Sequence, residues 1–339
     1  MKILVTGAAG FIGYHTVDKL LSIKGNRVIG VDSMNNYYSK KLKIARINNL
    51  KKKYKRNFIF KKIDLSEQKS VFNLFKNYRF NKVINLAAQA GVRYSLKNPK
   101  AYFNSNLSGF FNILEACRKY KIHHLVSAST SSVYGANKQM PFKVTNTADH
   151  PIQFYAATKR SNEILAHSYS YLFKMPVTLL RFFTVYGPWG RPDMSLFIFV
   201  KNILQKKPIE VYNFGKHSRD FTYIDDIVSG VVLVLNHIPS SNNSNHSMDN
   251  VETSSELFKI FNIGNNKPIE LLEYVSCIEE ILGKKAIKIL EPMQLGDVED
   301  TWADIEEMAK IGYGPTTDLK QGMKNFIEWF LDFYDIKKY

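Results

Sequence analysis

Near its start the chain reads Ile3-Leu4-Val5-Thr6-Gly7-Ala8-Ala9-Gly10-Phe11-Ile12-Gly13, with glycines spaced G-x-x-G-x-x-G directly behind a short apolar run. Only glycine turns this tightly and lets the backbone approach a phosphate. A helix that begins here directs its N–H groups and the positive end of its dipole at that anion. The pattern therefore predicts a strand, a phosphate-binding turn and a helix. An ordinary strand–turn–helix with convenient glycines is the alternative.

The residue after the second predicted strand argues for a dinucleotide. Residues 27–31 are apolar enough to form a strand, and Asp32 follows them directly. A carboxylate at this point accepts a hydrogen bond from a ribose 2′-hydroxyl and repels a 2′-phosphate. The sequence thus predicts NAD rather than NADP as the cofactor.

Short apolar runs alternate with helical patterns through the first half of the chain. The predicted strands are 2–6, 27–31, 57–63, 82–87, 122–128 and 176–181, and the predicted helices include 11–22, 67–77, 99–119 and 155–173. This alternation predicts an α/β fold, a Rossmann-type doubly wound parallel sheet over residues 1–182. After residue 182 shorter elements predict a smaller α/β substrate-binding lobe, residues 183–339, interleaved with the first domain. The polar stretch 239–255 predicts a mobile surface loop.

Composition limits the function classes. The chain has 339 residues, 45% of them hydrophobic, and its longest apolar run, near 227–235, is too short to span a bilayer. The start Met1-Lys2-Ile3 does not resemble a signal peptide. Cys117 and Cys277 form no C-x-x-C pair, and the eight histidines show no metal-ligand spacing. We expect a cytoplasmic protein with no metal and no membrane insertion.

The chain is strongly basic, with a net charge of +17, and residues 40–62 carry eleven Lys or Arg and no acid. This segment has two interpretations: a patch for nucleic acid or a membrane surface, or a solvated lysine-rich helix and loop. Its aromatic residues do not alternate with basic ones at the spacing of a known module. We favour the second interpretation and expect no nucleic-acid partner, although a basic surface would help to collect anionic nucleotides.

Tyr155-Ala-Ala-Thr-Lys159 opens a predicted helix and places a phenol and an ammonium on one face. A free phenol has a pKa near 10, and lowering it by about 3 units takes roughly 4 kcal/mol of differential interaction. A nearby ammonium and a positive nicotinamide would favour the phenolate, which makes Tyr155 a candidate general base. The run 127–132, rich in Ser and Thr, ends a predicted strand at the sheet edge where ligands bind. Its hydroxyls could share a proton with the tyrosine, although a turn or helix cap is the simpler interpretation.

With these motifs in order, the chain resembles the extended short-chain dehydrogenase/reductases, and within them the nucleotide-sugar 4-epimerases, above all those that act on UDP-glucuronate. The resemblance covers nearly the whole chain. Its most specific marks are the segments 181–194 (RFFTVYGPWGRPDM), 219–223 (RDFTY) and 296–298 (GDV). The chain departs from the family at Gln153-Phe154, where a small hydroxyl residue and an aliphatic are usual, and in the apparent insertion 239–255.

The resemblance implies a role for each matching residue. It makes Thr130, Tyr155 and Lys159 catalytic. It assigns NAD binding to Gly7, Gly10, Phe11, Ile12, Gly13, Asp32, Asn35, Asp64, Leu65, Leu86, Ala87, Ala88, Gln89, Asn106, Tyr155 and Lys159. It assigns the UDP-sugar to Arg93, Thr130, Ser131, Ser132, Thr184, Arg191, Arg219, Gln294 and Asp297. It also implies a homodimer built from helices 99–119 and 155–173.

The implied reaction is NAD-dependent 4-epimerisation of UDP-glucuronate to UDP-galacturonate through a transient 4-keto sugar. UDP-glucose, a UDP-N-acetylhexosamine or an N-acetylated uronate remain alternative substrates. Ser131 and Ser132 follow Thr130 where dehydratases of this fold usually carry acidic residues, which argues against elimination. A non-catalytic NAD-sensing or RNA-binding protein is the alternative from another class.

Overall fold

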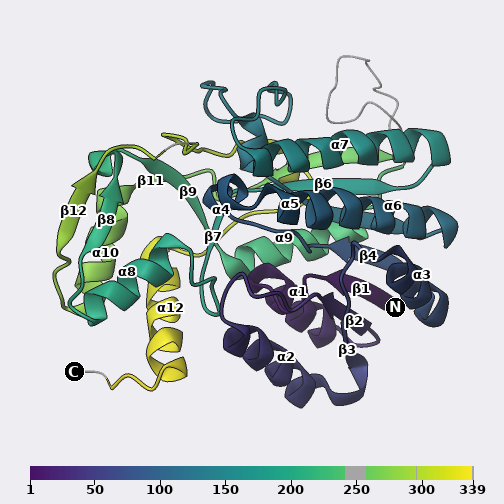
Figure 1. Ribbon diagram of the computed structural model, residues 1–339, viewed down its shortest axis with the longest axis horizontal. Coiled ribbons are helices and arrows are strands. Elements are labelled where there is room, and N and C mark those ends of the chain that lie inside the picture. Colours follow the sequence, from purple (N-terminus) through teal and green to yellow (C-terminus); the bar gives the residue numbers. More distant parts are fainter. Residues whose placement is uncertain (241–256, 295, 338–339) are drawn as a thin grey trace.

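The computed structural model describes residues 1–240, 257–294 and 296–337. Its centre is a parallel sheet of seven strands in the order β10-β6-β5-β4-β1-β2-β3 (Figure 1). The strands are β1 (Lys2–Thr6), β2 (Arg27–Asp32), β3 (Phe58–Lys62), β4 (Lys82–Asn85), β5 (His124–Thr130), β6 (Val177–Phe182) and β10 (Phe258–Ile263). The doubly wound parallel sheet predicted from the sequence is confirmed.

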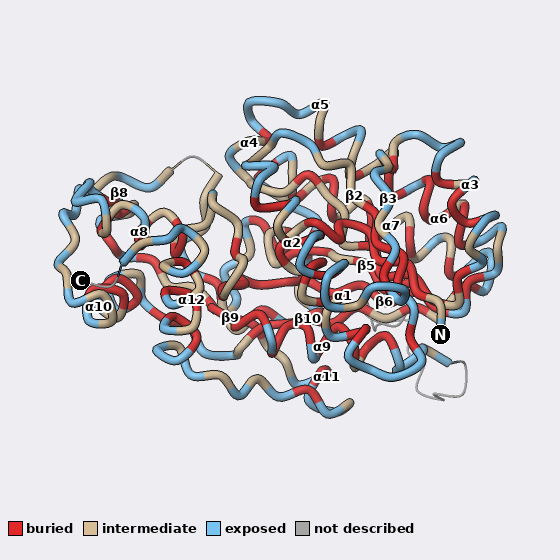
Figure 2. Tube along the Cα trace, turned by 90° about the horizontal axis from the view of Figure 1, so that it is seen from below, coloured by how far each residue is buried: buried red, intermediate tan, exposed pale blue. Residues whose placement is uncertain are grey.

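Helices cover both faces of this sheet. They are α1 (Phe11–Ser22), α2 (Lys40–Tyr54), α3 (Gln68–Tyr78), α4 (Val92–Lys97), α5 (Pro99–Tyr102), α6 (Gly109–Lys119), α7 (Phe154–Phe173) and α9 (Ile224–Asn236). Successive residues of β1 point to opposite faces, as strand geometry requires. Ile3 and Val5 share a core with α1 and α9, whereas Leu4 packs in a second core with α3, α6 and α7. Figure 2 shows buried residues concentrated along the strands.

A smaller lobe stands beside the sheet. It contains a three-stranded sheet of β7 (Thr184–Tyr186), β9 (Ser218–Tyr223) and β11 (Pro268–Glu270), and a pair formed by β8 (Ile209–Tyr212) and β12 (Lys288–Glu291). The helices α8 (Ser195–Leu204), α10 (Leu271–Leu282), α11 (Glu306–Ala309) and α12 (Leu319–Phe333) complete the described part of this second half. Aromatic side chains of α8 and α12 pack together, with the rings of Phe197 and Phe330 5.1 Å apart.

The structure adds two features to the predicted elements, and it shows the expected helix in the basic segment 40–62. Strand β10 comes from the second half of the chain and pairs with β6, so the central sheet draws on residues beyond 182. Residues 99–119 form α5, a π-helical segment over 103–108 and α6 rather than one regular helix. Residues 40–54 of the basic segment form α2. Most of the loop predicted at 239–255 lies outside the described residues, and the division at 182/183 stays a prediction.

Candidate functional site

The glycine turn has the close backbone approaches that its sequence predicts. Gly7 has φ +69°, and a Cβ there would lie 2.9 Å from the backbone nitrogen of Ala87, which follows β4. A Cβ on Gly13 would lie only 2.0 Å from the carbonyl oxygen of Gly7. The Gly10 N–H donates to that same carbonyl at 2.8 Å. The turn therefore tolerates no side chain at Gly7 or Gly13, and Phe11 and Ile12 begin α1 directly behind it.

Asp32 lies at the end of β2, beside this turn. Its carboxylate accepts hydrogen bonds from the N–H of Ala9 at 3.3 Å and of Met34 at 2.8 Å. Asn35 follows in the same loop and accepts from the Lys43 ammonium of α2 at 2.8 Å. The structure thus brings the predicted Asp32 and Asn35 to the same edge as the glycines.

The remaining predicted dinucleotide contacts follow β3 and β4. Asp64 caps a turn by accepting from the N–H of Ser66 at 2.9 Å. Asn106 is buried in the π-helical segment, a distortion found frequently at functional sites. Its side chain accepts from the N–H of Gln89 at 2.7 Å and donates to the Thr158 hydroxyl at 3.0 Å. Asn106 therefore fixes the segment after β4, which carries Leu86, Ala87, Ala88 and Gln89, against α7.

The predicted catalytic residues come from β5 and α7. Thr130 ends β5, and its hydroxyl accepts from the N–H of Ser132 at 3.2 Å. Ser131 and Ser132 form the short 3-10 turn that follows. Tyr155 and Lys159 lie in the first two turns of α7, and the Thr130 hydroxyl interacts with the Tyr155 phenol. The structure therefore brings Thr130 and Tyr155 together at the carboxyl end of a parallel strand.

The protonation of Tyr155 differs from the expectation. Burial raises the pKa of its phenol, and the Thr130 hydroxyl and the charge of Arg191 act in the opposite direction. Lys159 is not among the groups that shift this pKa. The expected lowering by Lys159 is therefore not found in the free protein, because the penalty of burial outweighs the favourable contacts.

Lys159 itself is an unusual ammonium. It is only 2% exposed. Burial lowers its pKa from 10.5 to about 8, while the charge of Glu163 raises it. Burying a cation is costly, so this site suits a ligand that brings hydrogen-bond acceptors.

Behind Lys159 lies a buried network that the sequence analysis missed. Glu163 of α7 accepts from Arg181 of β6 at 2.9 and 2.8 Å, and also from the Ser129 hydroxyl at 2.6 Å. Both Glu163 and Arg181 are 1% exposed at their side chains. Glu163 comes one helical turn after Lys159 and three residues after Arg160, with which it also pairs at 2.9 Å. These positions were the signals available in the sequence, since Arg181 and Ser129 lie on the strands β6 and β5.

The predicted substrate residues form separate groups. Arg219 donates to the Asp297 carboxylate at 3.1 Å, and the N–H of Asp297 donates to the carbonyl of Gln294 at 3.1 Å. The Gln294 Oε1 atom is buried and has no hydrogen-bond partner among the described residues. Arg93 of α4 lies over the ring of Tyr212, 5.0 Å from its centre, and so bridges α4 and β8.

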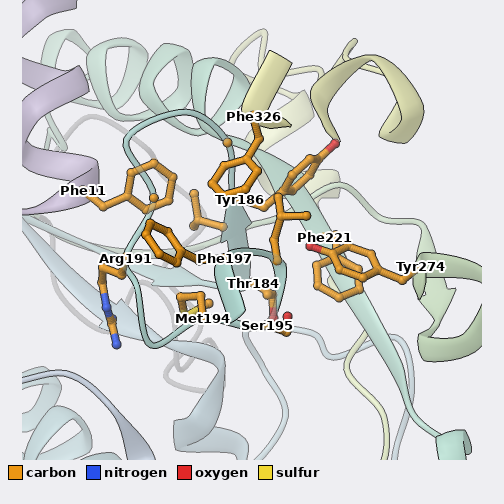
Figure 3. Close-up of a pocket in the computed structure, with 14 residues that line it drawn as sticks. Phe11, Thr184, Tyr186, Arg191, Met194, Ser195, Phe197, Phe221, Tyr274 and Phe326 are labelled. Carbon is orange, nitrogen blue, oxygen red and sulfur yellow. The ribbon is translucent and has the colours of Figure 1, made fainter. Parts of the chain in front are cut away.

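Thr184 and Arg191 belong to another group, which lines a pocket between α1 and the lobe (Figure 3). Phe11 of α1 faces this pocket from one side, and the lobe residues Phe221 and Tyr274 from the other. Neither Thr130 nor Tyr155 is among its lining residues. Some predicted substrate residues therefore line the pocket, and others lie near Tyr155 or in the group around Arg219. They do not form one continuous cluster.

Comparison with known proteins identifies the family. The model of the NAD dependent epimerase/dehydratase family matches residues 3–263. The chain belongs to this NAD-dependent epimerase/dehydratase family. Protein CapI of Staphylococcus aureus is 48% identical over 337 residues, covering 98% of this chain and 99% of that protein. A probable UDP-glucuronate 4-epimerase of Rhizobium meliloti is 44% identical over 336 residues, covering 97% of each.

A solved structure resembles the whole chain of this family member. The UDP-glucuronic acid 4-epimerase of Bacillus cereus, in complex with UDP-glucuronic acid and NAD, superposes with a TM-score of 0.88. It is 34% identical, and the match covers 98% of this chain and 100% of that one. The suspected relation to nucleotide-sugar epimerases is therefore confirmed.

The residues present fit NAD, the cofactor of the family. The Gly7 turn leaves room only for backbone, the start of α1 offers N–H groups to a pyrophosphate, and the Lys159 side chain is buried in the second turn of α7. Within the described ranges, no group of three or more His, Cys, Asp or Glu is placed to hold a metal ion. Nor does any helix there combine the length and apolarity needed to cross a membrane.

Proposed function

We propose that this chain is an isomerase that epimerises UDP-glucuronate at C4, giving UDP-galacturonate. The observation that carries the proposal is the meeting of Thr130 and Tyr155 at the carboxyl end of β5, beside the buried Lys159. The similarity to enzymes named for this reaction, over nearly the full length of each chain, supports the same substrate.

NAD would be held by the residues assigned to it from the sequence. The Gly7–Gly13 turn and the N-terminus of α1 would bind the pyrophosphate. Asp32, whose carboxylate already orients the N–H of Ala9, would accept from a ribose hydroxyl. Lys159 would donate to the other ribose, whose hydroxyl oxygens are acceptors for its ammonium. When bound, NAD⁺ supplies the hydride exchange that inversion of a secondary alcohol requires.

Tyr155 would hold the proton of the sugar 4-hydroxyl. The phenol takes this proton as the alcohol becomes a ketone and returns it when the alcohol forms again. Because burial raises the pKa of this phenol, positive charge on a bound ligand would favour its base form. The Thr130 hydroxyl would bridge the 4-hydroxyl and the phenol and keep the proton path short.

A uronate brings a hazard, because a 4-keto uronate is a β-keto acid and loses CO₂ readily. We propose that Ser131, Ser132 and Thr184 hold the carboxylate through neutral hydroxyls. Thr184 lines the pocket, and the two serines follow Thr130 directly. Arg191, Arg219, Gln294 and Asp297 would hold the uridine diphosphate, since arginine forks pair well with phosphate oxygens.

We further propose a cytoplasmic homodimer with a smaller lobe from residue 183 onward. The helices α6 and α7 leave large apolar side chains exposed, among them Ile164 at 57% and Leu172 at 64%. Such a patch is typical of a protein–protein interface, and two copies would bury it as a four-helix bundle. Both cysteines are free, which supports a reducing compartment.

The test is to incubate the purified protein with UDP-glucuronate without added NAD and to look for UDP-galacturonate by chromatography. The Tyr155→Phe variant is the matched control, since it removes one oxygen. UDP-glucose and the N-acetylated sugars, run in parallel, identify the preferred substrate. If the folded protein turns over none of these sugars, the epimerase proposal is wrong. If UDP-pentose is the main product, the proposed protection of the carboxylate is wrong.

A further inference from the structure

Arg46 of α2 is a fully buried cation that no carboxylate among the described residues pairs with. Its guanidinium donates instead to backbone carbonyls and to one hydroxyl. One nitrogen, Nη1, donates to the carbonyl of Ala9 at 2.8 Å and to the Tyr38 hydroxyl at 2.7 Å. The other, Nη2, donates to the carbonyls of Trp189 and Gly190. A single planar group thus joins two loops that lie far apart in the sequence.

The two loops belong to the two proposed binding sites. Ala9 lies in the glycine turn, and its own N–H donates to Asp32, so Arg46 and Asp32 hold its peptide groups from both sides. Trp189 and Gly190 directly precede Arg191, which lines the pocket. Arg46 is therefore in contact with the cofactor turn and with the segment that positions a substrate arginine.

The substrate loop is held in a conformation that it would not keep unaided. Gly187 has φ +140° and Trp189 has φ +61°, a region that a side chain as large as tryptophan rarely occupies. The Trp189 ring packs against Trp329 and Phe333 of α12. Three polar contacts also hold this loop: Arg46, the His15 ring on the carbonyl of Pro188 at 2.9 Å, and the Tyr37 hydroxyl on Asp193 at 3.0 Å. All three come from α1, α2 or the segment between β2 and α2, the region around the glycine turn. These contacts therefore fix the backbone at Trp189 and next to Arg191 from the side of the glycine turn.

We propose that Arg46 is a positioning residue that couples the two sites, so that the substrate nucleotide and NAD each tighten the binding of the other. The inference rests on the proposed function, because it takes the turn as the cofactor site and the pocket as the nucleotide site. A lysine at this position keeps the charge but has one nitrogen and cannot span both loops. The Arg46→Lys substitution therefore keeps the positive charge and removes the contact with one of the two loops.

The experiment uses the holoenzyme as purified and UDP as the probe. The rate at which bound NAD exchanges with excess labelled NAD is measured with and without saturating UDP. Couplings between sites typically change affinity by about 5–150-fold, and most such changes appear in dissociation rates. We expect UDP to slow NAD release by a factor in this range in the wild type, and by less than about twofold in Arg46→Lys. Lys53→Met, on the same helix but in an exposed ion pair with Asp18, is the control and should behave as the wild type.

A second measurement needs no variant and so does not depend on whether Arg46→Lys folds. Hydrogen exchange of the holoenzyme should slow on UDP addition in α2, which has no residue in the proposed nucleotide site. Unchanged exchange in α2, or equal slowing of NAD release in a folded Arg46→Lys, overturns the coupling while leaving the proposed function intact. If the wild-type protein binds neither UDP nor NAD, both the coupling and the proposed function are wrong.

Discussion

Replacing Lys159 with methionine should stabilise the free protein while it destroys activity. The ammonium is buried, and burial lowers its pKa from 10.5 to about 8. At about 1.4 kcal/mol per pKa unit, this shift means that the charged side chain costs the folded state about 3 kcal/mol at neutral pH. Methionine has a similar shape and no charge. Glu163 keeps its bonds to Arg181 and Arg160, so the substitution leaves no new unpaired carboxylate.

The lowered pKa of Lys159 determines how the free energy of unfolding changes with pH. The unfolded chain keeps the ordinary lysine pKa, so between about pH 8 and 10.5 it binds more protons at this residue than the folded chain. Stability of the wild type therefore rises with pH in that window relative to Lys159→Met. The advantage of the variant should be complete below pH 8 and disappear above pH 10.5.

The assay is thermal unfolding of both proteins, freed of NAD, at pH 7 and at pH 9.5. With an unfolding entropy of about 2 cal/mol/K per residue, 3 kcal/mol corresponds to a rise in Tm of roughly 4 °C at pH 7. Lys51→Met, at an exposed lysine of α2, is the control and should change stability by less than about 0.5 kcal/mol. A variant that is no more stable than the wild type at pH 7, or a difference that does not shrink with pH, refutes the argument. Turnover of the stabilised variant should fall by at least about 100-fold.

Three further substitutions test other parts of the site. Tyr155→Phe should lower kcat by about 10²–10⁴-fold while bound NAD still copurifies, and wild-type turnover in this variant would remove Tyr155 from the proton path. Asp32→Asn removes a negative charge and should shift the ratio of NAD to NADP dissociation constants toward NADP by roughly 1–4 kcal/mol; an unchanged ratio in a binding titration contradicts the assigned role. Glu163→Leu leaves Arg181 buried and unpaired, and urea denaturation should show a loss of about 3–5 kcal/mol. The exposed pair of Glu280 and Lys320 provides the comparison, since breaking it with Glu280→Leu should cost less than about 1 kcal/mol, and equal losses would contradict the effect of burial.

The sequence predicted those parts of the fold that local patterns determine. Parallel strands are buried on both faces and appear as apolar runs, which is why β1 to β6 lie within a few residues of their predicted places. Strand β10 could not be placed in the same way. It joins the sheet beside β6 from the second half of the chain, after the alternation of strands and helices has ended. Which strand pairs with which is a property of the whole fold, not of the local pattern.

The candidate site likewise contains residues that local motifs predict and residues that only the complete fold brings together. The glycine spacing, Asp32, Thr130 and the Tyr155–Lys159 pair were found because each is a local motif at the end of a predicted strand or the start of a predicted helix. The electrostatic surroundings of Lys159 could not be found in this way. The charge that acts on Lys159 is Glu163, and Glu163 is paired with Arg181 of β6, which no local motif connects to it. Arg46 looks in the sequence like any other basic residue of its lysine-rich helix. Its burial depends on carbonyls more than a hundred positions away.

The two unusual cations have a common consequence for ligand binding. Arg46 and Lys159 are both buried, neither has a carboxylate hydrogen-bonded to it among the described residues, and both lie beside the proposed cofactor site. Burying these charges costs the free protein stability. A ligand that brings oxygen acceptors to Lys159 recovers part of that cost, whereas the Arg46 guanidinium already donates to oxygen atoms of the protein. NAD binding would therefore be favoured in two ways: by the contacts that NAD makes, and by the relief of an unfavourable charge already buried in the folded chain. An epimerase that regenerates its cofactor in each cycle benefits from such tight retention, because a released dinucleotide would leave the ketone intermediate without its reductant.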